Sequence, residues 1–512
     1  MYEFDPGLAS ALICWRREMV GVERSVAHLE LETPFGCLRG ITVDGVTAFH
    51  RVPYAEAPIG PRRFELAGPA PRWRDTRDAT VPGPVPPQLP SRLDSVMGTY
   101  EVEQSEDCLH LDIWTTHRAG DNAPVLVFLH GGAFMTGGGS LPCYNGSVLA
   151  GENGLVVVNI TSRLGLLGFW PGPDFGELNL GLHDQVAALR WIRETISCFG
   201  GDPARITVIG QSAGAFSIAA FLGTDLGRDL FSRAIIMSAP VGVELRTVET
   251  VRPLAKTLLD VLGLADQDAN RLRTMPVDQI LGLLRGLQNR PPAIPGDISP
   301  PFMPVLDGSL IPRDPVASIQ NGSARWCDIM IGVTREEYAA FSLSNPTLND
   351  LSESEVNDIF KLQLGSGAAD AIMKIRSARV PAIPRTIVGD LYTDTIFTDA
   401  SLAVATAQAK AGRNVFSYRF DWQSPVPGLG ACHCIDLPFL FGNIDVWRNA
   451  PMLKGADWRE VEGLSRRFRG AIAAFAKSGE PNGTDLSHWP AYTHNRAVLH
   501  FDRRIQAFAW VA

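Results

Sequence analysis

Four short apolar runs in the first half of the chain constrain its fold more than any other feature. Each run has the length of a β-strand and is apolar on both faces, which is typical of central strands covered by helices on both sides. The runs are Pro124–His130, Leu155–Ile160, Arg205–Gly210 and Arg233–Ala239. Between them, His183–Phe199 carries apolar residues at helical spacing. This alternation predicts an α/β fold with a large, mostly parallel central sheet and helices on both faces.

The second half of the chain continues the same pattern. Strand-like segments occur at Trp326–Val333, Asn414–Phe420 and Ala497–Asp502, and residues 243–300 show a helical pattern with a proline-rich end. Length alone would suggest about three domains. Because no internal repeat and no low-complexity linker divides the sequence, we instead expect a single domain over residues 1–512.

The charge pattern and hydropathy argue against nucleic-acid binding and against a membrane span. The formal net charge is −9, and no basic cluster would suit a phosphate backbone. No apolar run approaches the roughly 20 residues that a membrane-spanning helix needs. Residues 1–25 make a poor signal peptide because their first charges are acidic, and we interpret them as an N-terminal extension.

The cysteines do not have the spacing of a zinc site. Eight cysteines are spread along the chain, and only Cys432 and Cys434 lie close together, on either side of His433. A structural zinc needs four ligands, and no second cluster supplies the rest. The sequence therefore predicts no metal, no other cofactor and the reduced thiols of a cytoplasmic protein.

A serine between two glycines is the first candidate for chemistry. Gly210-Gln211-Ser212-Ala213-Gly214 follows a strand-like run and opens an apolar helical segment, which is the context of a nucleophile elbow. Such a turn aims the serine Oγ away from the sheet, and the positive end of the following helix points toward it. A serine that only caps a helix is the alternative interpretation. The strand–turn–helix context favours the nucleophile.

A second glycine-rich segment, Phe128–Ser140, also follows an apolar strand. In an acyl-transfer enzyme, backbone N–H groups of such a loop bind the oxyanion that forms on attack. Each donor contributes roughly 10²–10³-fold to turnover. An ordinary flexible turn is the alternative, but two glycine-rich elements that both follow strands favour the catalytic interpretation.

Longer blocks of the sequence resemble the type-B carboxylesterases, the cholinesterase-like branch of the α/β-hydrolases. The blocks that carry this resemblance include Val52–Phe64, Ser105–Trp114, Phe199–Ala215 and Glu480–Tyr492. They are collinear with the family over most of the chain. The resemblance implies an α/β-hydrolase fold and a serine hydrolase that cleaves carboxylic esters of small molecules.

The resemblance also implies a catalytic triad. The family's acid falls at Glu337 in the segment IGVTREEYAAF, with Glu336 and Asp307 as competitors, and its histidine falls at His433 in CHCIDLPFLFGN. The resulting order, with Ser212 first, then the acid, then the histidine, is the order of α/β-hydrolases.

Further features of the family map onto other segments of the chain. The resemblance implies an oxyanion hole built from the backbone N–H groups of Gly132, Ala133 and Ala213. It also implies that residues 243–300 and 347–385 supply the walls and lid of a substrate gorge.

Several positions depart from the family pattern. Gln211 replaces the usual glutamate before the serine, which predicts weaker stabilisation of a protonated His433. Cys434 follows the histidine and is either an oxidation-sensitive thiol or a packed, inert one. Ser162 and His110 replace tyrosines, and the sequence offers no functional account of either.

Two further departures concern the compartment and the substrate. Cys108 lies where secreted members anchor a disulfide, but the expected partner position holds Pro86, which supports reduced thiols. The loop from Pro87 to Cys108 has no tryptophan, so choline esters are not expected as dedicated substrates.

Two alternatives to a plain esterase remain open. One is a non-catalytic interaction module of the same fold, although the chain keeps both the serine and the histidine. The other is an acyltransferase or a specialised catabolic esterase, because acceptor choice depends on pocket shape. The sequence does not determine the oligomeric state.

Overall fold

The structure is a computed structural model that describes residues 25–172, 176–288, 297–343, 345, 348, 350–483, 486 and 488–509. Of the N-terminal extension expected over residues 1–25, residues 1–24 lie outside the described part of the chain.

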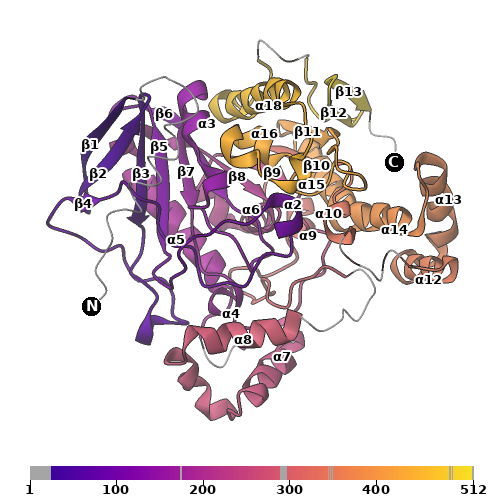
Figure 1. The fold of residues 1–512 in the computed structure, drawn as a ribbon, viewed down its shortest axis with the longest axis horizontal. Coiled ribbons are helices and arrows are strands. Elements are labelled where there is room, and N and C mark those ends of the chain that lie inside the picture. The colour runs from indigo at the N-terminus through magenta and orange to yellow at the C-terminus, as the bar shows by residue number, and fades with distance from the viewer. Residues whose placement is uncertain are drawn as a thin grey trace.

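The described strands form one 13-stranded sheet. The strands are β1 (Val26–Thr33), β2 (Gly36–Val43), β3 (Val46–Pro53), β4 (Arg77–Asp78), β5 (His110–Thr115), β6 (Ala123–Leu129), β7 (Val156–Ile160), β8 (Gly201–Gln211), β9 (Arg233–Met237), β10 (Asp328–Thr334), β11 (Val415–Phe420), β12 (Ala497–Phe501) and β13 (Gln506–Ala509). Their order is β1-β2-β3-β5-β7-β6-β8-β9-β10-β11-β12-β13, and β4 pairs with β2 (Figure 1).

The sheet is parallel in its centre and antiparallel at its edges. Every pair from β7 to β12 is parallel. Along the sheet order, each pair from β1 to β7 and the pair of β12 with β13 are antiparallel, whereas the short β4 pairs with β2 in parallel. The prediction of a parallel α/β sheet is therefore confirmed for the centre. The edges differ because short connections, such as the turn at Pro34-Phe35 between β1 and β2, join neighbouring strands as hairpins.

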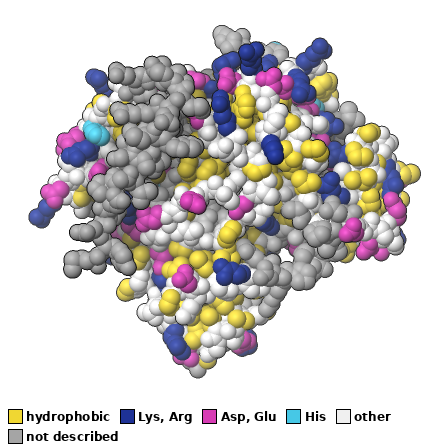
Figure 2. Space-filling model, viewed as in Figure 1, with side chains coloured by type: hydrophobic (Ala, Val, Ile, Leu, Met, Phe, Trp, Pro, Cys, Tyr) yellow, Lys and Arg dark blue, Asp and Glu magenta, His cyan; other side chains and the backbone are white. Residues whose placement is uncertain are grey.

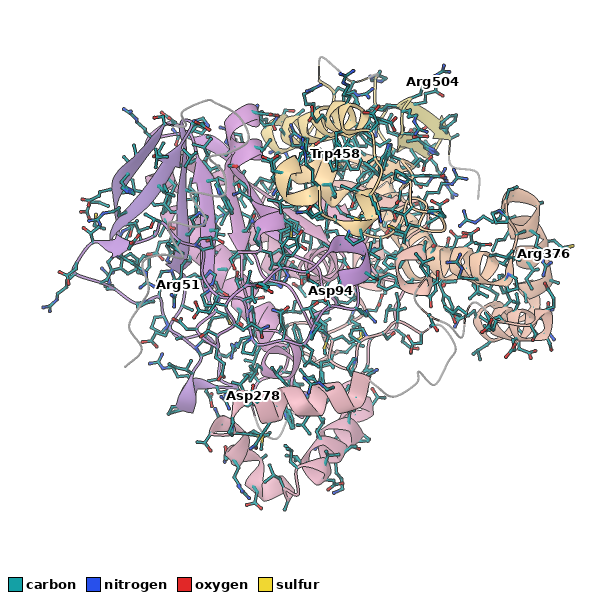
Figure 3. The ribbon with its side chains drawn as sticks, in the orientation of Figure 1. Arg51, Asp94, Asp278, Arg376, Trp458 and Arg504 are labelled. Atoms are coloured by element: carbon teal, nitrogen blue, oxygen red, sulfur yellow. The ribbon has the colours of Figure 1, made fainter. Side chains whose placement is uncertain are left out.

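Helices cover both faces of the sheet. The α-helices are α2 (Asp94–Met97), α3 (Ser147–Asn153), α4 (Gly165–Gly168), α5 (Leu180–Thr195), α6 (Ala213–Leu222), α7 (Val248–Val261), α8 (Val277–Gln288), α9 (Pro315–Gln320), α10 (Ala339–Ser342), α12 (Glu353–Leu364), α13 (Ala368–Ala378), α14 (Pro384–Tyr392), α15 (Asp399–Lys410), α16 (Leu437–Phe441), α17 (Ile444–Trp447) and α18 (Trp458–Ser478). A π-helical segment, η7 (Thr393–Thr398), joins α14 to α15. Helix α2, which begins at the labelled Asp94, lies near the middle of the view in Figure 3.

The alternation of side chains along β6 shows how the two layers form. Val125, Val127 and Leu129 belong to one apolar cluster, which also contains residues of α5, α6 and α15. Leu126 and Phe128 belong to the opposite cluster, with residues of α3, α16 and α18. Because successive side chains of a strand point to opposite faces, an uninterrupted apolar run supplies both cores at once.

The two regions expected to supply the walls and lid of the gorge contain helices at the edge of the molecule. Helices α7 and α8 lie within residues 243–300, and α12, α13 and the start of α14 lie within residues 347–385. In Figure 1 the first pair lies along the bottom of the view, and α12 and α13 lie at its right. Residues 289–296, 347 and 349 are outside the described part of the chain.

The visible surface carries no concentrated charge of one sign. Figure 2 shows basic and acidic side chains interspersed over the described residues of this face. None of the described helices combines the length and the apolar character that a membrane crossing requires.

Candidate active site

Ser212 occupies a strained turn between β8 and α6. Its backbone has φ 55° and ψ −120°, a conformation that costs a residue with a side chain about 1–3 kcal/mol. The turn is held on both sides, because the Ser212 N–H donates to the Met237 carbonyl (2.9 Å) and the Phe216 N–H donates to the Ser212 carbonyl (2.9 Å). The strand–turn–helix context expected for a nucleophile elbow is therefore present.

The glycines on either side of the serine are required by close packing. A Cβ on Gly214 would lie 1.9 Å from the Leu129 carbonyl oxygen, and a Cβ on Gly210 would lie 2.5 Å from the Gly214 carbonyl carbon. These distances leave no room for a side chain. The sharp turn is possible because β6, β8 and the start of α6 approach one another through glycine.

A buried carboxylate and a buried imidazole meet beside this turn. Glu337 Oε2 lies 2.5 Å from His433 Nδ1, and both side chains are almost completely buried. Glu337 Oε1 accepts the Thr334 N–H at the end of β10 (2.6 Å), which fixes the carboxylate. With Nδ1–H donating to the carboxylate, His433 Nε2 carries the lone pair that a general base needs.

The structure separates Glu337 from its two competitors. Glu336 accepts hydrogen bonds from the Ala431 N–H (2.6 Å) and from Arg379 Nη1 (2.8 Å). Asp307 accepts from Asn179 Nδ2 (2.7 Å) and from N–H groups of its own turn. Of these three acids, Glu337 is the one bonded to the His433 ring.

Gln211, rather than Ser212, forms the hydrogen bond to His433 Nε2. Gln211 Nε2 donates to that nitrogen at 3.2 Å, and its second contact is Cys434 Sγ at 3.4 Å. The described contacts include no hydrogen bond between Ser212 Oγ and the imidazole. Ser212 directly follows Gln211 in the chain, and hydrogen bonds of catalytic groups are often loose without substrate.

Two aromatic rings pack beside the imidazole. The ring centroids of Phe341 and Phe397 lie 5.3 Å and 5.1 Å from that of His433. Phe341 belongs to α10 and Phe397 to η7, so two separate segments hold the orientation of the ring. Neither ring was among the predicted site residues. Phe341 ends the segment IGVTREEYAAF that carries Glu337, but no motif assigns it a role, and Phe397 reaches the site only through the path of the chain.

The glycine-rich loop presents free backbone donors to the same place. Gly132 and Ala133 have φ of 111° and 56°, and a Cβ on Gly132 would lie 1.9 Å from the Thr136 carbonyl oxygen. Ala213 is the first residue of α6, where an N–H has no acceptor within the helix. No described residue accepts a hydrogen bond from the N–H of Gly132, Ala133 or Ala213.

His130 is a structural residue of this loop. Its Nδ1 lies 2.8 Å from the Gly131 carbonyl oxygen, and burial lowers the pKa of the imidazole to about 4. The neutral ring packs where a Cβ on Gly137 would lie, 2.6 Å from Nδ1. His130 therefore shapes the loop, as the sequence suggested.

The groups next to His433 in the chain, Cys434 and Asp436, are buried, and burial raises the pKa of each. Burial raises the pKa of the Cys434 thiol well above its usual range, which favours the packed, inert alternative for this cysteine. Burial and the nearby Glu337 carboxylate raise the pKa of Asp436 to about 7. Tyr418 donates a hydrogen bond to the Asp436 carboxyl group at 3.3 Å.

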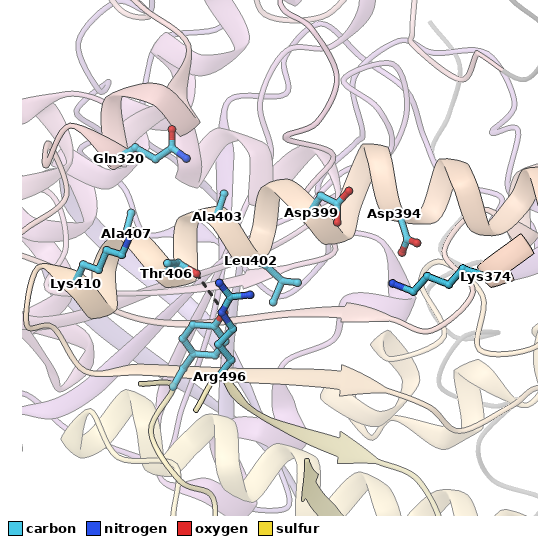
Figure 4. Close-up of a pocket in the computed structure, with 11 residues that line it drawn as sticks. Gln320, Lys374, Asp394, Asp399, Leu402, Ala403, Thr406, Ala407, Lys410 and Arg496 are labelled. Carbon is cyan, nitrogen blue, oxygen red and sulfur yellow. Dashed lines mark hydrogen bonds between the residues drawn. The ribbon is translucent and has the colours of Figure 1, made fainter. Parts of the chain in front are cut away.

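A separate cavity of about 600 Å³ lies along α15, outside this site (Figure 4). Lys374, Asp394 and Asp399 lie at one end, and Lys410 lies at the other. Asp394 belongs to η7, the same segment that carries Phe397, whose ring packs beside His433.

The site residues come from separate strands and meet at one edge of the sheet. Gly132 follows β6, Ser212 follows β8, Glu337 follows β10 and His433 follows β11. These strands are parallel, so their carboxyl ends lie together, which is where open α/β sheets place ligands. The topology thus explains why residues so distant in sequence share one site.

Comparison with known proteins shows the same architecture. The carboxylesterase family model matches residues 27–509. The chain is 37% identical to phenmedipham hydrolase of Pseudarthrobacter oxydans, covering 92% of this chain and 93% of that protein. It is 35% identical to para-nitrobenzyl esterase of Bacillus subtilis (strain 168), covering 94% and 96%.

A solved structure gives the same result for the fold. The carboxylesterase EST55 of Geobacillus stearothermophilus superposes with a TM-score of 0.83 and is 36% identical, covering 93% of this chain and 97% of that one. Matches of this length, on a sheet with these connections, establish the relationship. The chain therefore belongs to the carboxylesterase family and is a carboxylic ester hydrolase of the α/β-hydrolase fold.

Proposed function

We propose that Ser212, His433 and Glu337 hydrolyse small-molecule esters through an acyl-serine intermediate. His433 Nε2 takes the proton of the Ser212 hydroxyl while Oγ attacks the ester carbonyl. Glu337 holds the imidazole tautomer and stabilises the imidazolium. His433 then donates the proton to the departing alcohol, and water cleaves the acyl-serine by the reverse proton path.

The backbone donors complete this mechanism. The N–H groups of Gly132, Ala133 and Ala213 bind the oxyanion of both tetrahedral intermediates. Their conformations support this role, since the donors are fixed before substrate arrives and no described group competes for them.

The single observation that carries the proposal is the 2.5 Å contact between Glu337 and His433 beside a strained serine turn. A buried carboxylate–imidazole contact that served only packing would not need a serine at positive φ. An interaction module of the same fold would not need to retain all three groups.

A series of 4-nitrophenyl esters from acetate to octanoate tests the proposal. We expect a burst of 4-nitrophenol that matches the enzyme concentration wherever deacylation is slower than acylation, followed by steady turnover. The chain-length optimum will measure the acyl pocket. Absence of turnover on the whole series would favour the interaction module, and faster product formation with added alcohols would favour acyl transfer.

The proposal also covers the substrate class, the gorge around the site and the location of the protein. The relative named para-nitrobenzyl esterase makes para-nitrobenzyl esters the first substrates to test. In this proposal, residues 243–300 and 347–385 form the walls and lid of the gorge within a single domain. A cytoplasmic location is supported by the described cysteines, all of which are free thiols.

Gln211→Glu should move the acidic limb of the kcat/KM profile to higher pH. The amide lies 3.2 Å from His433 Nε2, and a carboxylate there would favour the protonated imidazole, which cannot act as the base. At this distance we expect a movement of about one pH unit or more. The kcat/KM profile should be measured with 4-nitrophenyl butyrate over about two pH units on each side of neutrality.

Gln211→Met is the matched control, because it keeps the side-chain length without adding charge. It should leave the acidic limb in place even if the maximal rate falls. An unchanged limb in Gln211→Glu would show that this side chain does not act on the catalytic base.

A further inference from the structure

One arginine is connected to the His433 imidazole through a single aromatic ring, Phe341. Arg92 precedes α2, and its guanidinium carbon lies 5.4 Å from the centroid of the Phe341 ring. Phe341 in turn packs on His433 at 5.3 Å. The guanidinium carbon thus lies no more than about 11 Å from the centre of the imidazole ring, so a substrate that reacts at His433 can extend a second group toward it.

Arg92 forms no ion pair with any of the described residues. Nη1 donates to the Ile298 carbonyl at 2.7 Å, which leaves the other guanidinium N–H groups available. The negative charge of Asp297 acts on Arg92, but this carboxylate accepts the Ser299 N–H (2.8 Å) within its own turn.

Arg92 is a cation in a partly enclosed environment. Surrounding protein atoms lower the pKa of the guanidinium, yet an arginine remains protonated at every pH where the enzyme folds. Arg92 is exposed and Phe341 is partly exposed, whereas Phe397, the second ring beside the imidazole, is buried. A ligand that approaches His433 over Phe341 therefore meets a charge with free donors.

Structural anchoring alone does not explain this arrangement. A single hydrogen bond to a carbonyl could be made by a neutral side chain, and stacking on phenylalanine contributes only about 0.5–1 kcal/mol at an exposed site. The planar guanidinium suits a carboxylate, which it can bind with two parallel hydrogen bonds. Arg92 therefore has the chemistry of a recognition group.

We propose that Arg92 makes this enzyme selective for esters that carry a second, negatively charged carboxylate on the part of the substrate that contacts Phe341. This inference rests on the proposed ester hydrolysis. The hydrolysis itself is unchanged: water adds across the ester bond, and Arg92 binds the carboxylate without taking part in the reaction.

Matched substrates test the selectivity on either side of the ester bond. On the acyl side, 4-nitrophenyl hydrogen adipate is compared with 4-nitrophenyl hexanoate. On the alcohol side, 4-(hexanoyloxy)benzoate is compared with its methyl ester. The measured quantity is the ratio of kcat/KM for the anionic and neutral member of each pair.

Arg92→Gln should lower this ratio by about tenfold or more for the pair whose carboxylate reaches the guanidinium, mainly through KM. Turnover of the neutral esters should stay within about threefold of wild type, because Arg92 does not touch the imidazole. Arg92→Lys should recover part of the ratio, and Asp297→Asn should raise it by removing the opposing charge.

Arg448→Gln is the matched control. The guanidinium carbon of Arg448, at the end of α17, lies 5.7 Å from the ring centroid of Trp458, which is labelled in Figure 3. It should leave both ratios unchanged. The selectivity is refuted if Arg92→Gln leaves both ratios unchanged, or if it lowers anionic and neutral turnover equally. If the wild-type enzyme hydrolysed none of these esters, the proposed function itself would be refuted.

Discussion

Ser212→Ala is expected to abolish ester turnover, with a fall in kcat of about 10⁴-fold or more. The hydroxyl is the atom that would form the acyl-enzyme, and alanine retains the backbone turn while removing it. The residual rate should come from the oxyanion donors and substrate binding alone. The measurement is the burst amplitude and steady rate on 4-nitrophenyl butyrate, and no burst is expected.

Ser217→Ala provides the control for Ser212→Ala. Ser217 is a buried serine of the same helix, and its Oγ donates to the Ala213 carbonyl at 3.1 Å. Its removal should cost stability of about 1 kcal/mol, with kcat within a few-fold of wild type. A Ser212→Ala enzyme that still showed a burst would place the nucleophile elsewhere.

Glu337→Gln should lower kcat by about 10⁴-fold while the fold is retained. A glutamine amide at this position can donate to His433 Nδ1 and so favours the tautomer with the proton on Nε2. That tautomer cannot accept the serine proton, and the imidazolium loses its counter-charge. The measurement is kcat on 4-nitrophenyl butyrate, with thermal unfolding to confirm that the variant is folded.

Asp307→Asn and Glu336→Gln separate this role from the effect of losing any buried acid. Asp307 bonds to Asn179 and to its own turn, and Glu336 pairs with Arg379, so neither variant alters the His433 tautomer. We expect lower thermal stability in Glu336→Gln and less than about tenfold loss of kcat in either. If Asp307→Asn lost as much activity as Glu337→Gln, the assignment of the acid would be wrong.

The neighbouring acids Glu336 and Glu337 show where sequence reasoning ends. Both follow β10 in one turn, and composition and spacing do not distinguish them. Their backbones place one carboxylate toward Arg379 and the other toward His433, which is 96 residues further along the chain. The choice depends on where the loop after β11 returns, and no local pattern encodes that path.

The strands and the elbow, in contrast, were determined by the sequence itself. The continuous apolar runs that became β6, β7, β8 and β9 require cover on both faces, and the glycines around Ser212 require a tight turn between strand and helix. These requirements act between residues close in the chain, so they can be deduced without coordinates.

Only the tertiary structure decided which groups meet at the carboxyl ends of those strands. It placed Gln211 on His433 Nε2, Phe341 and Phe397 beside the ring, and Arg92 over Phe341. Each of these contacts joins segments that come together through long connections. Apolar periodicity and turn residues specify the elements themselves, whereas such contacts depend on how the loops between elements pack in three dimensions.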